Sequence, residues 1–299
     1  MKTLVVILGP TGVGKTELTL NVARQFNVPV INADSRQIYK EIPIGTAAPT
    51  KEQQALVKHY FVGNRHIQDY YSAAMFECDV LQLLDKLFIN SDIALMSGGS
   101  MMYIDAVCKG IDDIPTVKDT VRAEIKERLK RDGLESLCDE LKRLDPEYWN
   151  IVDKKNTRRV VHAVEICIQT GQTYSSFRKN EIKQRPFKIF QIGLNLPREV
   201  MYERINGRVL KMIDRGLLDE VLNVYPLKGL NALNTVGYKE LFSYIDGSVD
   251  FNEAVRQIQS NTRRYMRKQI TWFKKNDNIK WFEPSDEENI IKYISDKIQ

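Results

Sequence analysis

The sequence has 299 residues, of which 43% are apolar and 28% charged, values that are ordinary for a soluble globular protein with one large domain or two smaller ones. No apolar stretch reaches membrane-spanning length, and the first predicted strand begins at residue 3. We therefore expect a cytoplasmic protein with no signal peptide and no membrane partner. The four cysteines form no C-x-x-C pair, which argues against a zinc site and favours reduced thiols.

The net charge of +5 is unevenly distributed along the chain. Residues 154–188 contain nine lysines and arginines against two acids, and residues 262–275 contain six against none. A single run of this kind is most often only a solvated face. Because both runs also contain aromatic residues, together they indicate a polyanionic partner.

Residues 9–16 read GPTGVGKT and match the phosphate-binding loop pattern G-x-x-x-x-G-K-[ST] at every fixed position. The apolar run 3–8 before them predicts a buried parallel strand, and residues 17–26 after them have helical character. Such a loop presents backbone N–H groups to a phosphate, while Lys15 neutralises charge and the Thr16 hydroxyl ligates Mg²⁺. The alternative is a glycine-rich turn without a ligand. The predicted diphosphate-binding residues of the loop are Gly9, Pro10, Thr11, Gly12, Val13, Gly14, Lys15 and Thr16.

The wider pattern predicts an α/β fold, a P-loop NTPase-like parallel sheet flanked by helices. The expected strands are residues 3–8, 28–32, 93–97, 189–194 and 279–282. Between the third and fourth strands, residues 118–142 form an amphipathic helical stretch broken at Asp132-Gly133, and Gly171 is a candidate helix C-cap. We therefore expect a catalytic core from residues 1–115 and 186–299, with residues 116–185 as a helical insertion domain.

Two further motifs follow predicted strands and so belong at the carboxyl edge of the sheet, beside the phosphate loop. Asp34-Ser35-Arg36-Gln37 follows the second strand, and Asp34 is either a general base or metal-linked acid, or an ordinary helix N-cap. Ser97 to Tyr103 forms a second strand-to-glycine turn at the same edge.

A late segment, residues 262–273, is expected as a helix with a broad basic face. Trp272 and Phe273 are expected to anchor its other side, where core packing is a simpler role than stacking on a base.

Together these motifs resemble the bacterial tRNA dimethylallyltransferases, also called tRNA isopentenyltransferases, over nearly the whole chain. Besides the phosphate loop, the resemblance is carried by Asp34–Gln37, Ile44–Ala47, Tyr71–Ala73, Gly98–Ser100 with Tyr103, Val236–Tyr238 and Arg267–Phe273. The Asp-Ser-Arg-Gln and Gln-x-Thr-Trp-Phe blocks are more specific than the phosphate loop. Three positions depart from the family, since Ala48, Ser100 and His162 stand where Lys, Thr and Arg are usual.

The resemblance implies transfer of a dimethylallyl group from its diphosphate to N6 of the adenosine 3′-adjacent to the tRNA anticodon. It implies Asp34 as the base, with Lys15, Thr16 and Mg²⁺ on the diphosphate. Arg208 is a further candidate for the diphosphate, or a solvated surface arginine. The insertion and the late helix are expected to grip the anticodon stem-loop. The implied tRNA-binding residues are Asp34, Ser35, Arg36, Gln37, Ser100, Arg122, Arg158, Arg159, Val160, Val161, His162, Arg267, Lys268, Gln269, Thr271 and Trp272. A monomer without an obligate protein partner is expected.

Three other functions remain open from the residues alone. A P-loop kinase acting on a small metabolite accounts for the phosphate loop but gives no role to the basic segments. An adenine-nucleotide isopentenyltransferase shares the chemistry but has less use for a basic insertion. A non-catalytic RNA-binding module leaves the acid beside the loop unexplained.

Overall fold

The computed structural model describes residues 1–298, and by its internal contacts the chain divides into two compact units. Unit 1 comprises Met1–Cys108 and Arg185–Gln299, and unit 2 comprises Lys109–Gln184. Unit 2 contains the expected helical insertion, whose first helix begins at Asp119. Among residues 1–298, no helix combines the length and apolar character that a membrane crossing requires.

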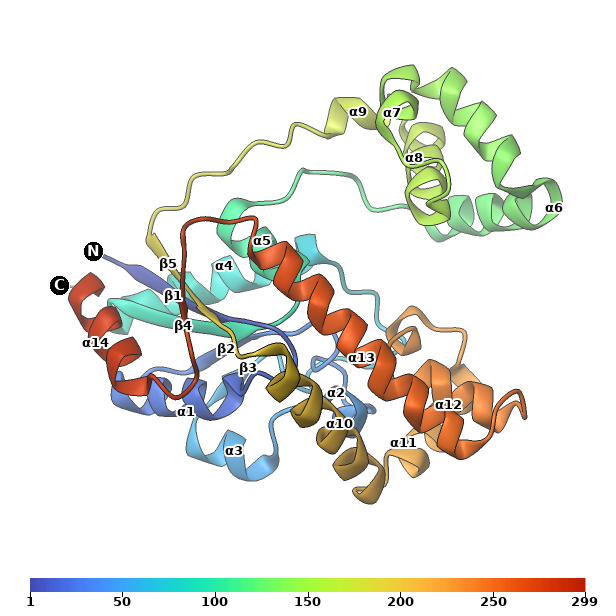
Figure 1. Ribbon diagram of the computed structural model, residues 1–299. Coiled ribbons are helices and arrows are strands. Elements are labelled where there is room, and N and C mark those ends of the chain that lie inside the picture. The colour runs from blue at the N-terminus through green and yellow to red at the C-terminus, as the bar shows by residue number, and fades with distance from the viewer. Residues whose placement is uncertain (299) are drawn as a thin grey trace. The chain divides into compact units, whose positions relative to one another are not determined.

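Unit 1 is built on a six-stranded sheet in the order β3-β2-β4-β1-β5-β6, in which every pairing is parallel (Figure 1). The strands are β1 Thr3–Leu8, β2 Val30–Ala33, β3 His59–Tyr60, β4 Ile93–Gly98, β5 Lys188–Leu194 and β6 Ile279–Phe282. All five predicted strands are confirmed within two residues at their ends. The two-residue β3 was not predicted, because so short a pairing has no periodic pattern.

Strand β1 is buried along its whole length because helices cover both faces of the sheet. Its side chains alternate, so Val5 and Ile7 join one apolar cluster while Leu4, Val6 and Leu8 join the other. The first cluster includes residues of α1 (Lys15–Gln25), α10 (Arg198–Asp214) and α14 (Glu287–Ile298). The second includes residues of α4 (Ala73–Asn90) and α5 (Met101–Lys109). The strands are therefore held rigidly, with their carboxyl ends free to carry loops.

A third apolar cluster lies among the helices between β5 and β6 in the chain. Its helices are α10, α11 (Leu217–Val224), α12 (Tyr238–Ile245) and α13 (Phe251–Phe273), with the loop residues Ile38 and Ile42 packed among them. Two short helices, α2 (Pro43–Thr46) and α3 (Lys51–Leu56), and the 3₁₀ turns Tyr225–Leu227 and Asn231–Leu233 complete the unit. The cluster joins the segment after β2 to the C-terminal half of the unit.

Unit 2 is a small helical bundle with its own apolar core. Its helices are α6 (Asp119–Leu144), α7 (Pro146–Ile151), α8 (Thr157–Thr170) and α9 (Tyr174–Phe177). The expected break near Asp132-Gly133 is confirmed, since Gly133 has φ 78° inside α6. Gly171 caps α8 in the left-handed conformation, φ 68°, as expected of a glycine at this position.

Candidate active site

A cavity of about 630 Å³ opens at the carboxyl edge of the sheet in unit 1. Leu8 and Ala33 both lie beside Gly98 in the sheet register, so the loops that follow β1, β2 and β4 start side by side. Gly98 is required there, because a Cβ atom would lie 2.2 Å from the Ala33 carbonyl oxygen. The predicted juxtaposition of the phosphate loop, the Asp34 turn and the Gly98-Gly99 turn is therefore confirmed.

The phosphate loop has the backbone conformation that its glycines allow. Gly12 and Gly14 have φ 83° and 104°, in the left-handed region that L side chains avoid. Gly14 immediately precedes α1, so the helix begins at Lys15 with its first N–H groups at the loop. The Lys15 ammonium donates to the carbonyl oxygens of Gly9 and Pro10, at 2.8 Å each. These contacts hold the lysine across the loop.

Two cations share this end of the cavity without a carboxylate partner among residues 1–298. Burial, and after it the positive charge of Arg208, lower the pKa of Lys15 to about 7, while the charge of Asp34 acts in the opposite direction. Burial also lowers the pKa of Arg208, whose guanidinium donates to Thr11 Oγ1 at 3.3 Å. Arg208 lines the cavity rather than the open surface. An anion bound between Lys15 and Arg208 would offset the desolvation cost of the two buried cations and would reduce the repulsion between them.

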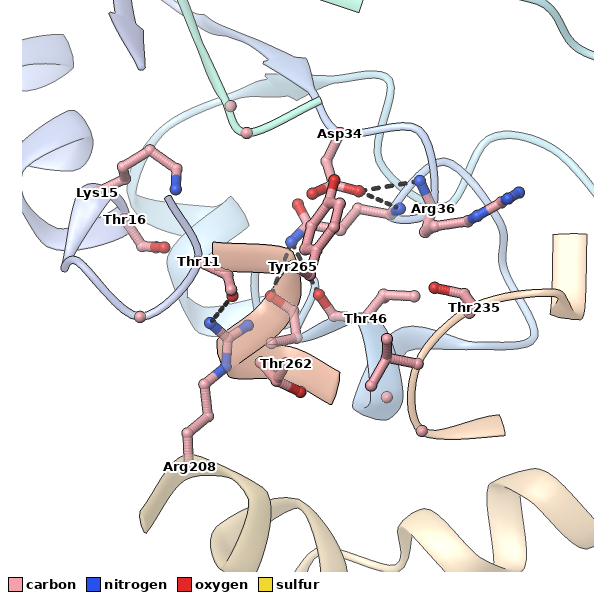
Figure 2. Close-up of a pocket in the computed structure, with 18 of the residues that line it drawn as sticks. Thr11, Lys15, Thr16, Asp34, Arg36, Thr46, Arg208, Thr235, Thr262 and Tyr265 are labelled. Carbon is pink, nitrogen blue, oxygen red and sulfur yellow. Dashed lines mark hydrogen bonds between the residues drawn. The ribbon is translucent and has the colours of Figure 1, made fainter. Parts of the chain in front are cut away.

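Asp34 shapes a turn rather than capping a helix, and its side chain also lines the cavity. Its Oδ1 accepts hydrogen bonds from the backbone N–H groups of Arg36, at 2.9 Å, and Gln37, at 3.4 Å, and so shapes the turn (Figure 2). Its Oδ2 accepts no hydrogen bond from any group of residues 1–298 and belongs to a side chain that lines the cavity. One carboxylate oxygen is therefore structural, while the other is free to accept a proton from a bound molecule.

The Asp34 turn is held against the neighbouring turn by Ser100. The Ser35 N–H donates to Ser100 Oγ at 2.8 Å, and the two hydroxyl oxygens lie 3.2 Å apart. Ser100 is 6% exposed, and its hydroxyl bonds to the protein backbone. Threonine is usual at this position in the family that the sequence resembles, and serine keeps the hydroxyl that forms this link.

Tyr265 and Arg204 are among the cavity-lining residues that the sequence did not predict. The Tyr265 ring of α13 lies beside the Asp34 carboxylate, and burial together with the Asp34 charge raises the pKa of the tyrosine (Figure 2). Arg204 lies one helical turn before Arg208 on α10 and donates to the Val13 carbonyl oxygen at 3.1 Å. The i, i+4 spacing of the two arginines was the sequence signal that could have identified Arg204.

Gln269 is a correction, because it was predicted to bind tRNA and is instead 2% exposed. Its Oε1 accepts the Thr11 N–H at 2.9 Å, and its Nε2 donates to the Gly99 carbonyl at 2.8 Å. A Cβ atom on Gly99 would lie 2.6 Å from this amide nitrogen. Gln269 therefore fastens the phosphate loop to the turn after β4, and both ends of its side-chain amide bond to the protein backbone.

The other predicted residues of α13 are exposed. Arg267 donates to the Tyr202 hydroxyl at 2.7 Å, and Trp272 Nε1 donates to Asp105 Oδ2 at 2.7 Å. Phe273 is 3% exposed and packs in the core as expected, whereas the same expectation for Trp272, 37% exposed, is wrong. The exposed members of the predicted set on this helix are Arg267, Lys268, Thr271 and Trp272.

In unit 2 the predicted residues fall on different sides of α8. Arg158 and Arg159 are exposed in its first turn, and Val161 and His162 are half-buried. Val160 is 0% exposed and packs in the core of the unit, so its prediction as a tRNA contact is wrong. The remaining member, Arg122, is half-buried on α6.

The chain offers few ligands for a metal ion. Among residues 1–298, no three His, Cys, Asp or Glu side chains are grouped so that they could hold one. The Thr16 hydroxyl and the Asp34 carboxylate both line the cavity. Because Mg²⁺ commonly binds through one or two protein oxygens together with substrate phosphates and water, these residues fit an ion that is held mainly by a bound diphosphate.

Comparison with known proteins identifies the family of the chain. Residues 37–276 match the family model described as IPP transferase. The tRNA dimethylallyltransferase 1 of Phocaeicola vulgatus is 55% identical, over 98% of this chain and 97% of that protein. The tRNA dimethylallyltransferase 1 of Bacteroides thetaiotaomicron is 53% identical, over 98% and 96%. The crystal structure of the full-length tRNA isopentenylpyrophosphate transferase from Bacillus halodurans matches with a TM-score of 0.73 and 31% identity, covering 100% of this chain and 97% of that one. This chain therefore belongs to the IPP transferase family.

Proposed function

We propose that this chain transfers a dimethylallyl group from dimethylallyl diphosphate to N6 of the adenosine 3′-adjacent to the anticodon of a tRNA, releasing diphosphate. The observation that carries the proposal is the polarity of one cavity. Lys15 and Arg208 lie at one end without a carboxylate partner among residues 1–298, and Asp34 offers an unpaired oxygen to the same space. The two cations suit an anionic leaving group, and the Asp34 oxygen suits a group that loses a proton.

The phosphate loop suits the leaving group. As the bond between C1 of the allyl group and oxygen breaks, its electron pair passes to the diphosphate, and negative charge grows on the phosphate oxygens. Backbone N–H groups at the start of α1 and the cations of Lys15 and Arg208 stabilise that charge. Mg²⁺ held by Thr16 and the diphosphate would supply further charge neutralisation.

The Asp34 end suits the acceptor. The exocyclic N6 of adenine is a weak nucleophile because its lone pair is delocalised into the ring. As N6 bonds to C1 it must lose a proton, and Asp34 Oδ2 is the acceptor for that proton. General base catalysis of this kind contributes about 10²–10⁴-fold to the rate.

A tRNA requires cations in addition to the cavity. Unit 2 presents Arg158 and Arg159 in the first turn of α8, and unit 1 presents Arg267 and Lys268 on α13. Their ammonium and guanidinium groups suit the phosphates of an RNA backbone. The target base must leave its stack, which costs least in a single-stranded loop. Since the proposed chemical groups all line one cavity of one chain, we also propose that the monomer is active.

The test is a transfer assay with purified protein, Mg²⁺ and radiolabelled dimethylallyl diphosphate, offered in parallel to unmodified tRNA with an A-rich anticodon loop, to AMP and to ATP. We expect label on tRNA alone. The Asp34→Ala variant should lower turnover about 10²–10⁴-fold while binding tRNA with nearly unchanged affinity. Label on AMP would indicate a nucleotide-prenylating enzyme, and ATP consumption without transfer would indicate a kinase. Near-normal turnover in Asp34→Ala would remove this residue from the mechanism.

A further inference from the structure

Glu220 is a buried acid that the proposed chemistry does not use. It lies on α11, is 8% exposed, and forms no ion pair with a cation among residues 1–298. Its Oε2 accepts the Ile44 N–H at 2.7 Å, and its Oε1 accepts the Gly45 N–H at 2.8 Å. The Tyr238 hydroxyl also donates to Oε1, at 2.6 Å. Three hydrogen bonds thus converge on one carboxylate from two distant segments of the chain.

These bonds cap a helix that cannot cap itself. Helix α2 follows Ile42, whose side chain has no hydrogen-bond acceptor, and the first N–H groups of any helix lack partners within it. Glu220 supplies the missing acceptor from 176 positions further along the chain. The backbone of α2 also lies directly on the Tyr238 ring, since a Cβ atom on Gly45 would be 2.5 Å from the tyrosine hydroxyl. Glu220 and Tyr238 therefore determine where α2 lies.

The other end of α2 leads to the cavity. The Gln37 side-chain amide donates to the carbonyl oxygens of Thr46 and Ala47, both at 3.0 Å. The Gln37 backbone N–H in turn donates to Asp34 Oδ1. Ala47 has φ 48°, a conformation that a non-glycine residue keeps only where its surroundings impose it. A continuous chain of hydrogen bonds therefore runs from the clamped helix to the proposed base.

We propose that Glu220, with Tyr238, is a positioning residue for the base: it fixes α2 so that Gln37 holds Asp34 in the orientation that accepts the proton from N6. This inference rests on the proposed function only where its test measures kcat and KM. The clamp acts on the Asp34 end of the cavity, whereas the phosphate loop is held by Gln269 and Arg204. Loss of the clamp should therefore lower kcat and leave the KM for dimethylallyl diphosphate nearly unchanged.

The test compares Glu220→Gln with Glu77→Gln. The amide of Glu220→Gln keeps one acceptor but places an NH₂ group against a backbone donor. Glu77 is a second buried carboxylate of unit 1, 5% exposed and 2.7 Å from Arg185, and it does not line the cavity. Its substitution therefore controls for lost stability alone. Tyr238→Phe keeps the ring against α2 while removing one donor, and should give a smaller effect of the same kind.

We expect Glu220→Gln to lower kcat about 10- to 100-fold, the cost of a misplaced catalytic group, with the KM for dimethylallyl diphosphate within about 2-fold. Hydrogen exchange should accelerate in residues 34–47, and Glu77→Gln should change neither readout below its unfolding temperature. Unchanged kcat, or an equal fall in kcat in both variants, would overturn the proposal. If the wild type transfers nothing to tRNA, the proposed function fails, and unchanged exchange in residues 34–47 of Glu220→Gln would then overturn the clamp separately.

Discussion

Replacing Gln269 with leucine tests the assignment of this residue to the protein interior. Leucine has a similar volume and fills the space, so little cavity is created. It leaves the Gly99 carbonyl and the Thr11 N–H without their partner. The substitution therefore isolates the two hydrogen bonds that join the phosphate loop to the turn after β4.

The expected cost follows from the burial of the two backbone groups. The hydrogen bond to the Gly99 carbonyl is buried, and an unsatisfied buried acceptor costs about 1–3 kcal/mol. The bond from the Thr11 N–H is partly buried, so water recovers part of its loss and the cost is about 1 kcal/mol. We expect the free energy of unfolding to fall by about 2–4 kcal/mol. Because the loop is less well held, the KM for dimethylallyl diphosphate should rise about tenfold or more.

Urea denaturation and steady-state transfer kinetics measure the two effects. Ser295→Ala is a suitable control, because among residues 1–298 its hydroxyl bonds only to the Ile291 carbonyl of its own helix. A loss of stability below about 0.5 kcal/mol, the range of ordinary surface substitutions, would refute the structural role of Gln269. A raised KM for tRNA with an unchanged KM for the diphosphate would instead indicate that Gln269 binds tRNA.

Two further predictions concern charge. Since the pKa of Lys15 is about 7 and a bound diphosphate favours the protonated ammonium, affinity for diphosphate should fall as pH rises from 7.5 to 9 and binding should take up a proton. Calorimetry in buffers of different ionisation enthalpy measures that uptake, and a Lys15→Arg variant that keeps the full pH dependence would contradict the assignment. Arg159→Glu should raise the KM for tRNA and reduce the slope of log affinity against log salt, measured beside Lys86→Glu on α4. An unchanged slope would exclude Arg159 from the RNA contacts.

The sheet and the grouping of its motifs could be predicted from the sequence because both follow from local rules. An uninterrupted apolar run such as Thr3–Leu8 indicates a strand buried on both faces, and parallel strands bring their carboxyl ends to one edge. Asp34 and the phosphate loop were therefore placed together without any knowledge of long-range contacts. The late strand Ile279–Phe282 was predicted in the same way.

Val160 and Gln269, two buried residues assigned to tRNA binding, show that not every residue of a motif belongs to the surface. Val160 lies within the segment 158–162, and Gln269 belongs to the block 267–273 that carries the family resemblance, although helical periodicity argues against an RNA contact at either position. Met266, Gln269 and Phe273 are spaced by three and four residues and share the buried face of α13. A polar side chain on such a face must find partners inside the protein. Periodicity could have shown that Gln269 points inward, but not that it forms hydrogen bonds with the backbone of Thr11 and Gly99.

The contacts that the sequence could not reveal all join an early loop to a late helix. Three loops of the cavity, those after β1, β2 and β4, come from the first 108 residues, yet Gln269, Arg204 and Glu220, which hold them, all come after residue 185. Each joins a backbone group of an early loop to a side chain of a late helix, so none leaves a pattern in the nearby sequence. The early segment therefore carries the base and the phosphate loop, while the late helices hold both in place. It follows that an enzyme of this design can acquire its full activity only after the chain beyond the insertion has folded onto the sheet.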